Sequence, residues 1–200
     1  MSSIKTIGEL GFCGPIGSNS HQAAVQAREE IEKNLGITLE LKSIDGNVAV
    51  IDSLTSSEDT FIVIATWNTI LGDMEDHLTK LQEVGGMPIL SEIEILIEHH
   101  LMGKKERLDT QTVLLAHPKA YEQCARTVMK VFSYLKYEGR TSASGAAEEA
   151  SKSDPNVVVA IAPIECSKIY GLNVYRPNIE DVWPNITKFR IYTNCKDLLK

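Results

Sequence analysis

The stretch GFCGPIGSNSHQAAVQA, residues 11–27, reads as the end of a strand, a glycine-rich loop and the start of a helix. Gly11, Gly14 and Gly17 keep the backbone thin, so that a ligand can approach it closely. The helix start offers N–H groups and a partial positive charge to an anion. The pattern predicts either a loop that receives a negatively charged molecule or an ordinary strand-to-helix turn capped by Ser20.

This loop does not carry a usual phosphate-binding signature. A P-loop needs Lys followed by Ser or Thr after its last Gly, and the dinucleotide fingerprint needs G-x-G-x-x-G after a strand. Neither spacing occurs in the loop. We expect no cofactor.

A strand followed by a helix recurs along the chain. TFIVIA, residues 60–65, is an apolar run typical of a central strand, and a helical pattern over 70–81 follows it. Residues 92–97 alternate apolar and polar side chains, which predicts a strand with one face in water. An apolar strand at 112–115 again precedes a helical pattern, which continues to Phe132. Repeated β and α elements predict an α/β fold with a largely parallel sheet.

Two Pro-containing stretches, Gly-Gly-Met-Pro at 85–88 and Arg-Pro-Asn at 176–178, are suited to crossings between two lobes. We expect the first lobe to comprise about residues 1–86 and 177–200, and the second about 87–176. Ligands of such folds bind at the carboxyl ends of strands, in the crevice between lobes.

Composition limits the class of protein. The chain has 200 residues, of which 43% are apolar and 24% charged, as in ordinary globular proteins. A net charge of −7 and a pI near 5.3 argue against a nucleic-acid partner. No apolar stretch is long enough to span a membrane, and MSSIKTIGEL, residues 1–10, lacks the pattern of a secretory leader. We expect a cytoplasmic protein without a membrane partner.

Metal and nucleophile chemistry have little support in the sequence. The four cysteines, Cys13, Cys124, Cys166 and Cys195, form no C-x-x-C pair, which favours buried thiols over zinc ligands or disulfides. His99 and His100 are consecutive in a predicted strand, so their rings point apart and we expect no metal.

Six segments follow the order and approximate spacing of prephenate dehydratase domains. NITKF, residues 185–189, resembles that family's Asn-x-Thr-Arg-Phe signature. The other five are GPIGSNSHQAA (14–24), WNTILG (67–72), HPKAYEQC (117–124), TSASGAAE (141–148) and AIAPIECSKIYGL (160–172). The resemblance covers nearly the whole chain and implies a two-lobed fold of the periplasmic-binding-protein type (type II), with the substrate in the cleft between the lobes.

The resemblance also assigns roles to individual residues. Thr187 donates a proton to the departing ring hydroxyl of prephenate while carbon dioxide leaves, and Asn68 and Gln123 fix polar groups of the substrate. Because aromatisation drives the reaction, a weak acid held in place can suffice. The implied substrate-binding residues are Ser18, Asn19, Ser20, Trp67, Thr69, Thr141, Ser142, Ala143, Ser144, Lys188 and Phe189.

The residue types alone leave other roles open for these side chains. Thr187 is equally suited to a plain strand position, Gln123 to an exposed helix surface and Asn68 to a helix cap. His117 before a proline is suited to a structural turn.

Several positions depart from the family pattern. Trp67 stands where the family usually has Glu, Leu71 where a second acidic residue is common, and Lys188 where it has Arg. These changes keep two alternatives open: a prephenate decarboxylase that retains the ring hydroxyl, and a non-catalytic protein that binds an aromatic acid against Trp67. The chain ends soon after the signature, so we expect no regulatory domain. Members of the family commonly form oligomers, so the resemblance allows a homodimer.

Overall fold

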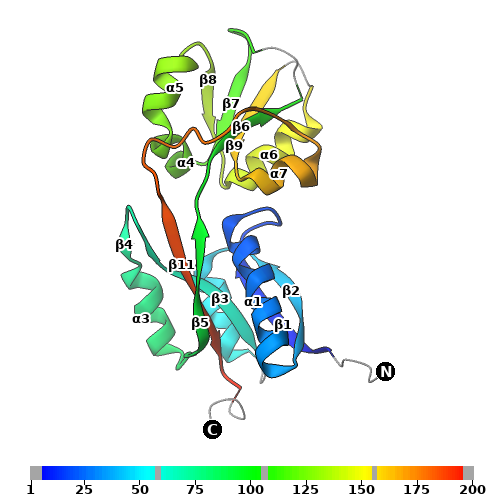
Figure 1. Ribbon diagram of the computed structural model, residues 1–200, viewed down its shortest axis with the longest axis vertical. Helices are drawn as coiled ribbons and strands as arrows, with labels where there is room; N and C mark the ends of the chain where they lie inside the picture. The colour runs from blue at the N-terminus through cyan, green and yellow to red at the C-terminus, as the bar shows by residue number, and fades with distance from the viewer. Residues whose placement is uncertain (1–5, 57–59, 105–107, 155–156, 196–200) are drawn as a thin grey trace. The chain divides into compact units, whose positions relative to one another are not determined.

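The computed structural model describes residues 6–56, 60–104, 108–154 and 157–195, and the chain forms two compact units (Figure 1). Unit 1 comprises Met1–Leu96 and Ile186–Lys200, and unit 2 comprises Ile97–Asn185. Both crossings therefore come later in the chain than the sequence predicts, because residues 87–96 form a strand of unit 1. Residues 1–5 of the N-terminal stretch considered above lie outside the described part.

Unit 1 contains a mixed sheet with strand order β2-β1-β3-β11-β5, and β4 pairs with β3. β1 runs parallel to β2 and β3, whereas β11 is antiparallel to β3 and β5. The prediction of a largely parallel sheet is therefore wrong, because the last strand enters from the opposite direction. The strands are β1 (Thr6–Cys13), β2 (Thr38–Ile44), β3 (Phe61–Asn68), β4 (Gly72–Asp73), β5 (Met87–Leu96) and β11 (Ile186–Thr193).

Helix α1 (Asn19–Leu35) begins and ends at residues with clear capping geometry. The Ser18 hydroxyl accepts a hydrogen bond from the N–H of His21 at 3.1 Å, so Ser18 is the cap and not Ser20. Gly36 ends the helix in the left-handed conformation, at φ 67°. Gly11 lies inside β1, where a Cβ atom would meet side-chain atoms of Ile44 and Ile62, so its small size serves packing.

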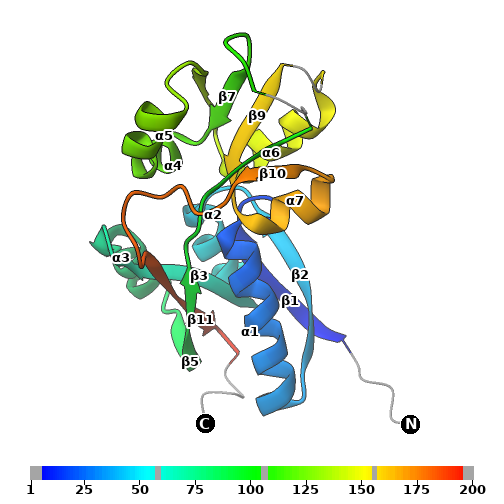
Figure 2. The ribbon, with the colours of Figure 1, turned by 45° about the horizontal axis from the view of Figure 1, so that its top comes forward.

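The helices of unit 1 cover opposite faces of its sheet (Figure 2). The chain moves from β1 to β2 through α1 and then back to β3 through α2 (Asn47–Asp52), and right-handed crossovers in opposite directions place their helices on opposite faces. α1 packs against β1, β2, β3 and β5. α2 and α3 (Glu75–Glu83) pack on the other face, together with the 3-10 turn Ser53–Thr55. That second face has a core of Val50, Ile51, Leu54, Ile62, Ile64, Leu81 and Tyr192.

The helical pattern predicted over 70–81 forms only in its second half. Ile70 and Leu71 are exposed in a turn, and α3 begins at Glu75. The alternation predicted in β5 is confirmed, because Ile93 and Ile95 are buried while Glu94 between them is exposed.

Unit 2 is built on a five-stranded sheet with order β10-β6-β9-β7-β8. β7 is parallel to β8 and β9, whereas β6 is antiparallel to β9 and β10. The predicted helix after the 112–115 strand is divided into α4 and α5 at Cys124. The elements are β6 (His100–Gly103), β7 (Val113–Ala116), α4 (Pro118–Gln123), α5 (Ala125–Val131), β8 (Lys136–Gly139), α6 (Ala143–Lys152), β9 (Val158–Ala162), α7 (Ile164–Tyr170) and β10 (Asn173–Arg176).

Two apolar clusters flank the sheet of unit 2. One joins the sheet to α4 and α5, with Cys124 and Val128 among its buried members. The other joins it to α6 and α7, where Ala146, Ala147 and Cys166 pack closely. The small residues of α6 let the helix approach the strands, which places its first turn beside the carboxyl ends of β7 and β9.

Candidate functional site

Asn68 and Thr187 form a hydrogen-bonded pair on one face of the unit 1 sheet. They lie opposite each other in the register of β3 and β11, so their side chains point to the same side. The Nδ2 atom of Asn68 donates to Oγ1 of Thr187 at 2.9 Å. Asn68 is 4% exposed and Thr187 7%, and such a protected setting strengthens the bond.

Backbone groups fix the direction of this bond. Oδ1 of Asn68 accepts from the N–H groups of Ile70 at 2.9 Å and Leu71 at 3.2 Å, and Nδ2 also donates to the carbonyl oxygen of Ile186 at 3.2 Å. An N–H can only donate and a carbonyl can only accept, so the amide cannot be reversed. The Thr187 hydroxyl therefore accepts from Asn68 and keeps its own proton for donation. Asn68 thus caps a turn and not a helix.

The start of α1 lies at the same edge and on the same face as this pair. β1 and β3 are parallel, so both strands end toward the same edge of the sheet, and α1 follows β1. Phe12 pairs with Val63, so β3 extends beyond the end of β1 before it reaches Asn68. The cap at Ser18 leaves the N–H groups of Asn19 and Ser20 without carbonyl partners inside the helix. Such groups, with the partial positive charge of the helix start, suit an anionic ligand.

Thr69 and Phe189 flank the pair in different ways. Thr69 is exposed, and its hydroxyl accepts from the N–H of Ile186 at 2.9 Å, which ties the end of β3 to the start of β11. Phe189 lies two residues beyond Thr187 and so shares its face, but it is buried between Ala65 and Ile93 in the sheet register. Phe189 therefore belongs to the packed layer beneath the pair.

Lys188 and Trp67 form a second register pair, on the opposite face of the same sheet. The Lys188 ammonium lies 5.5 Å from the centroid of the Trp67 ring, in a cation–π contact. It also forms ion pairs with Glu92 at 2.8 Å and Glu94 at 3.3 Å. The structure therefore separates Lys188 and Trp67 from Asn68 and Thr187, although the sequence grouped all of them around one substrate.

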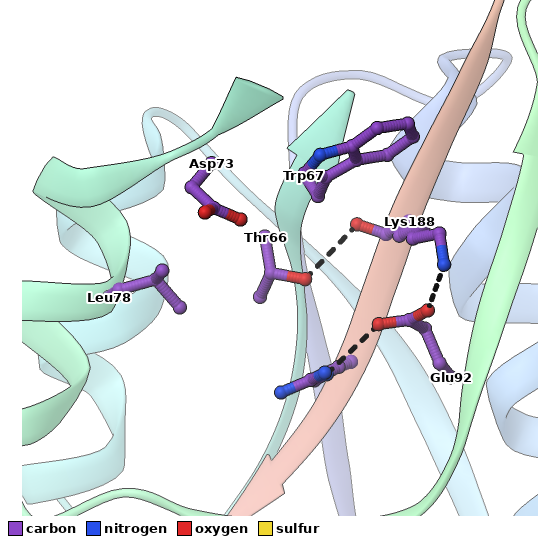
Figure 3. A pocket seen from close by; sticks show the side chains of 7 residues that line it. Thr66, Trp67, Asp73, Leu78, Glu92 and Lys188 are labelled. Carbon is purple, nitrogen blue, oxygen red and sulfur yellow. Dashed lines mark hydrogen bonds and ion pairs between the residues drawn. The ribbon is translucent and has the colours of Figure 1, made fainter. Parts of the chain in front are cut away.

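A pocket of about 370 Å³ surrounds this second pair, and Figure 3 shows Lys188 reaching toward Glu92 beside the Trp67 ring. Arg190 also binds Glu92, at 3.1 Å. Hydrogen bonds from Lys188 and Arg190 lower the pKa of the Glu92 carboxyl, outweighing its burial. We call Glu92, Glu94, Lys188 and Arg190 the charge ladder, since their signs alternate across β5 and β11. The pocket is lined by Thr66, Trp67, Asp73, Leu78, Glu92, Lys188 and Arg190.

The structure shows where the residues that depart from the family pattern lie. Trp67 and Lys188 stand where the resemblance leads us to expect Glu and Arg, and they are directly opposite each other. A cation–π contact here occupies the place of an acid–base pair. The pocket around Trp67 is lined by charged side chains as well as by Trp67 and Leu78. Leu71 contributes its backbone N–H to Asn68, and its side chain is exposed.

In unit 2, Ser142 caps α6 and shapes the start of that helix. Its hydroxyl accepts from the N–H of Gly145 at 2.9 Å. A Cβ atom at position 145 would come within 2.7 Å of the Ser142 oxygen, so glycine is required there. Ser144 is buried, and its hydroxyl has no partner among the described residues. Thr141 is exposed and Ala143 half-buried in the same turn.

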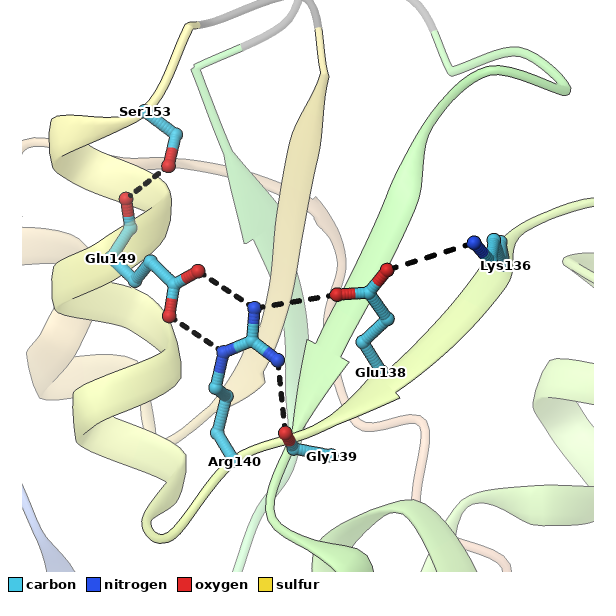
Figure 4. A network of polar contacts seen from close by, with 6 residues as sticks. All are labelled: Lys136, Glu138, Gly139, Arg140, Glu149 and Ser153. Atoms are coloured by element: carbon cyan, nitrogen blue, oxygen red, sulfur yellow. Dashed lines mark hydrogen bonds and ion pairs between the residues drawn. The ribbon is translucent and has the colours of Figure 1, made fainter.

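Arg140 clamps the turn that leads into α6 (Figure 4). Its guanidinium donates twice to the Glu149 carboxylate, at 2.6 and 2.7 Å, and once to the carbonyl oxygen of Gly139 at 2.9 Å. The bidentate bond keeps the pKa of Glu149 below its usual value. Sequence reasoning missed this clamp, because nothing in the spacing of Arg140 and Glu149 marks them as partners.

Gln123 ends α4 and is half-buried, so the interpretation as an exposed helix residue is wrong. Its Oε1 atom lies 2.8 Å from Nε2 of His99 and 3.4 Å from Nδ2 of Asn185. His117 caps α4 by accepting from the N–H of Lys119 at 3.2 Å, which confirms its structural role. The sequence signalled neither His99 nor Asn185 as a neighbour of Gln123.

Cysteine and metal chemistry add nothing to these residues. All four cysteines are free thiols, and burial raises the pKa of Cys166 to about 12. Among the described residues no group of three or more His, Cys, Asp or Glu side chains could hold a metal ion. The described helices include none long and apolar enough to cross a membrane.

The fold as a whole is that of periplasmic-binding-protein-like α/β proteins of type II. The periplasmic binding protein BugD has a TM-score of 0.54 to this chain at 8% identity, over 96% of this chain and 77% of its own. The prephenate dehydratase of Staphylococcus aureus has a TM-score of 0.74 at 21% identity, over 94% of this chain and 67% of its own.

Sequence comparison assigns the family. The family model described as prephenate dehydratase matches residues 10–196, so the chain belongs to the prephenate dehydratase family. A bifunctional chorismate mutase/prephenate dehydratase of Buchnera aphidicola is 29% identical over 184 residues, which cover 92% of this chain. The match spans 46% of the length of that relative.

Proposed function

We propose that this chain is a lyase that converts prephenate to phenylpyruvate with loss of water and carbon dioxide, in cytoplasmic phenylalanine biosynthesis. The observation that carries the proposal is the hydrogen bond between Asn68 and Thr187, whose direction leaves a hydroxyl proton available on a buried threonine. Family membership supports dehydratase chemistry. The ligand is a small molecule, and no cofactor takes part.

The Thr187 hydroxyl acts as the general acid in this mechanism. The bond from the ring to its carboxylate breaks, and its electron pair enters the ring as carbon dioxide leaves. The carbon–oxygen bond of the ring hydroxyl breaks with its pair on oxygen, and that oxygen takes the Thr187 proton to leave as water. The solvent then returns a proton to Thr187, so that the reaction balances without a further reactant.

Asn68 stabilises the charge that develops on Thr187. As the proton leaves, negative charge grows on Oγ1, and the Nδ2–H group already aimed at that atom stabilises it without rearrangement. The turn N–H groups of Ile70 and Leu71 keep the amide in this orientation. The Thr187 hydroxyl, a weak acid, thereby donates its proton more readily to the leaving oxygen.

Substrate binding requires local donors, because the chain carries a net charge of −7 and prephenate is a dianion. Each unit has a helix start suited to one carboxylate: residues 18–20 in unit 1 and 141–144 in unit 2. Gln123 adds an amide donor. Thr69 is exposed beside the pair, and its hydroxyl, which is bound to the backbone of Ile186, contributes to the polar surface that the substrate meets.

Identification of the product tests the proposal directly. Purified protein is mixed with prephenate, and the products are separated and identified by mass and absorbance. Phenylpyruvate with released carbon dioxide supports the proposal. A dihydro-hydroxyphenylpyruvate product identifies a decarboxylase, and unchanged prephenate with measurable binding identifies a non-catalytic binder, and either result overturns it.

A further inference from the structure

His99 is a buried histidine of unit 2 whose ring faces the side chain of Gln123. It lies just before β6, is 4% exposed, and places Nε2 at 2.8 Å from Oε1 of Gln123. Its backbone is held too: its N–H donates to Oε2 of Glu180 at 2.9 Å, and its carbonyl oxygen accepts from the N–H of Ile179 at 2.8 Å. The ring therefore has a fixed place beside Gln123.

The segment that holds His99 also holds the end of α4. The N–H of Asp181 donates to the carbonyl oxygen of Gln123 at 2.7 Å. The Asp181 carboxylate accepts from the N–H groups of Arg126 at 2.8 Å and Thr127 at 3.0 Å, at the start of α5. One short segment thus fixes the backbone of both partners, which sets the distance between the imidazole and the amide.

With the Gln123 amide oriented so that Oε1 faces His99, the hydrogen-bond roles give the ring nitrogen of His99 that carries hydrogen. Oε1 of Gln123 can only accept, so Nε2 of His99 and Nδ2 of Asn185, at 3.4 Å, are both donors to it. In the neutral ring Nδ1 then carries no hydrogen, and Nδ1 is buried without a hydrogen-bond partner among the described residues. Burial lowers the pKa of His99 more than the Gln123 bond raises it, which favours the neutral ring.

We propose that His99 is a positioning residue that, with Asn185, holds the Gln123 amide oxygen inward and so presents the two amide N–H donors to an oxygen of the substrate. The identity of that substrate as prephenate rests on the proposed function. A carboxylate or keto oxygen is the matching acceptor. Without the His99 donor the amide can turn over and present its own oxygen, which repels a carboxylate.

Three variants test the role in the enzyme. His99→Leu keeps the bulk and removes the donor, and we expect kcat/KM for prephenate to fall about tenfold, mainly through KM, as for one lost hydrogen bond. His99→Gln returns an N–H donor near the Nε2 position and should recover most of the loss. His100→Asn is the matched control: His100 is equally buried and accepts from the N–H of Asn178 at 3.3 Å, and in the described part of the chain no hydrogen bond joins it to Gln123. It should keep the wild-type KM.

Equal kcat/KM in the wild type and a folded His99→Leu variant overturns the proposal, as does a loss that His99→Gln does not reverse. Urea unfolding of each variant confirms that the folded protein is compared. If His99→Leu does not fold, the tautomer of the His99 ring in the wild-type chain gives the decision.

Nitrogen-15 NMR of the ligand-free chain provides a readout that does not depend on activity. We expect the His99 ring at neutral pH to show hydrogen on Nε2 and none on Nδ1. A ring with hydrogen on Nδ1 overturns the proposal. Because the tautomer is measured without prephenate, a protein that fails to form phenylpyruvate refutes the proposed function while the positioning of Gln123 is still decided.

Discussion

Thr187 and Lys188 are neighbours in the chain, yet they serve opposite faces of one sheet. Thr187 faces α1 with an uncharged partner, Asn68, and both are almost fully buried. Lys188 faces α3 with Trp67 and the carboxylates of the charge ladder, and it is partly exposed. Two neighbouring residues of the NITKF motif thus lie on different faces: the proposed acid Thr187 on one, and Lys188 with its ion pairs on the other.

The difference shows how the sequence of this chain departs from the family pattern while it keeps the hydrogen-bonded pair of Asn68 and Thr187. Trp67 and Lys188, two of the positions that depart from the family pattern, both lie on the face of the sheet that carries the charge ladder. On that face a cation–π contact can replace an ion pair. Asn68 and Thr187 are bound to backbone groups as well as to each other, so that face tolerates little change.

The largest expected effect follows from Thr187→Val, which keeps the shape and removes the hydroxyl. Loss of a positioned general acid lowers kcat by about 10²–10⁴-fold. Steady-state kinetics with prephenate should show this loss with little change in KM, and Thr187→Ser should retain much of the activity. Unaltered kcat in the valine variant would remove Thr187 from the mechanism.

The next effect is expected from Asn68→Asp. A carboxylate can still accept from the N–H groups of Ile70 and Leu71, but it cannot donate to Thr187. Removing one donor from a developing anion lowers kcat by about 10²-fold. Kinetics at pH 7 measure the loss, and the urea midpoint verifies that the turn persists. A variant with wild-type kcat contradicts the stabilising role of Asn68.

Lys188→Met should have a much smaller effect on turnover. The variant keeps an apolar stem beside Trp67 and removes the ion pairs with Glu92 and Glu94. Because the ladder is on the far face from Thr187, we expect kcat and KM near wild type and a slightly lower urea midpoint. A loss of activity as large as that of Thr187→Val would abolish the distinction between the two faces.

The smallest expected effect is a pH dependence of stability that arises from the charge ladder. The folded-state pKa of Glu92 is lowered, so its ionised form stabilises the fold above the unfolded-state pKa of about 4.3. That contribution is lost as pH falls through the folded-state value. The difference in urea midpoint between wild type and Lys188→Met should therefore shrink from pH 7 to pH 3. A constant difference contradicts the ion-pair assignment.

Sequence reasoning predicts most reliably what is repeated locally. The alternation of Ile93, Glu94 and Ile95 fixes which face of β5 is buried, because side chains alternate along a strand. The same rule separates Lys188 from Thr187 once NITKF is placed in a strand. Gly36 marks a helix end through its own backbone preference.

The remaining features depend on contacts between distant parts of the chain. Asn68 and Thr187 are brought together only by the register of β3 and β11, and family resemblance supplies their roles but not the bond between them. The position of β11 between β3 and β5 reverses the expected strand direction. Neither Arg140 with Glu149 nor His99 with Gln123 has a local signal, because each pair meets through tertiary folding.

The place of β11 also bears on how the chain matures as it is synthesised. Unit 2 is one continuous segment, so all of its strands have been synthesised before translation reaches Ile186. Unit 1 must wait, with the hydrogen-bonding edges of β3 and β5 open, until the final strand arrives between them. The threonine proposed as the acid arrives on that same strand, so a ribosome that stops short of it releases a protein with neither a closed sheet nor its proton donor.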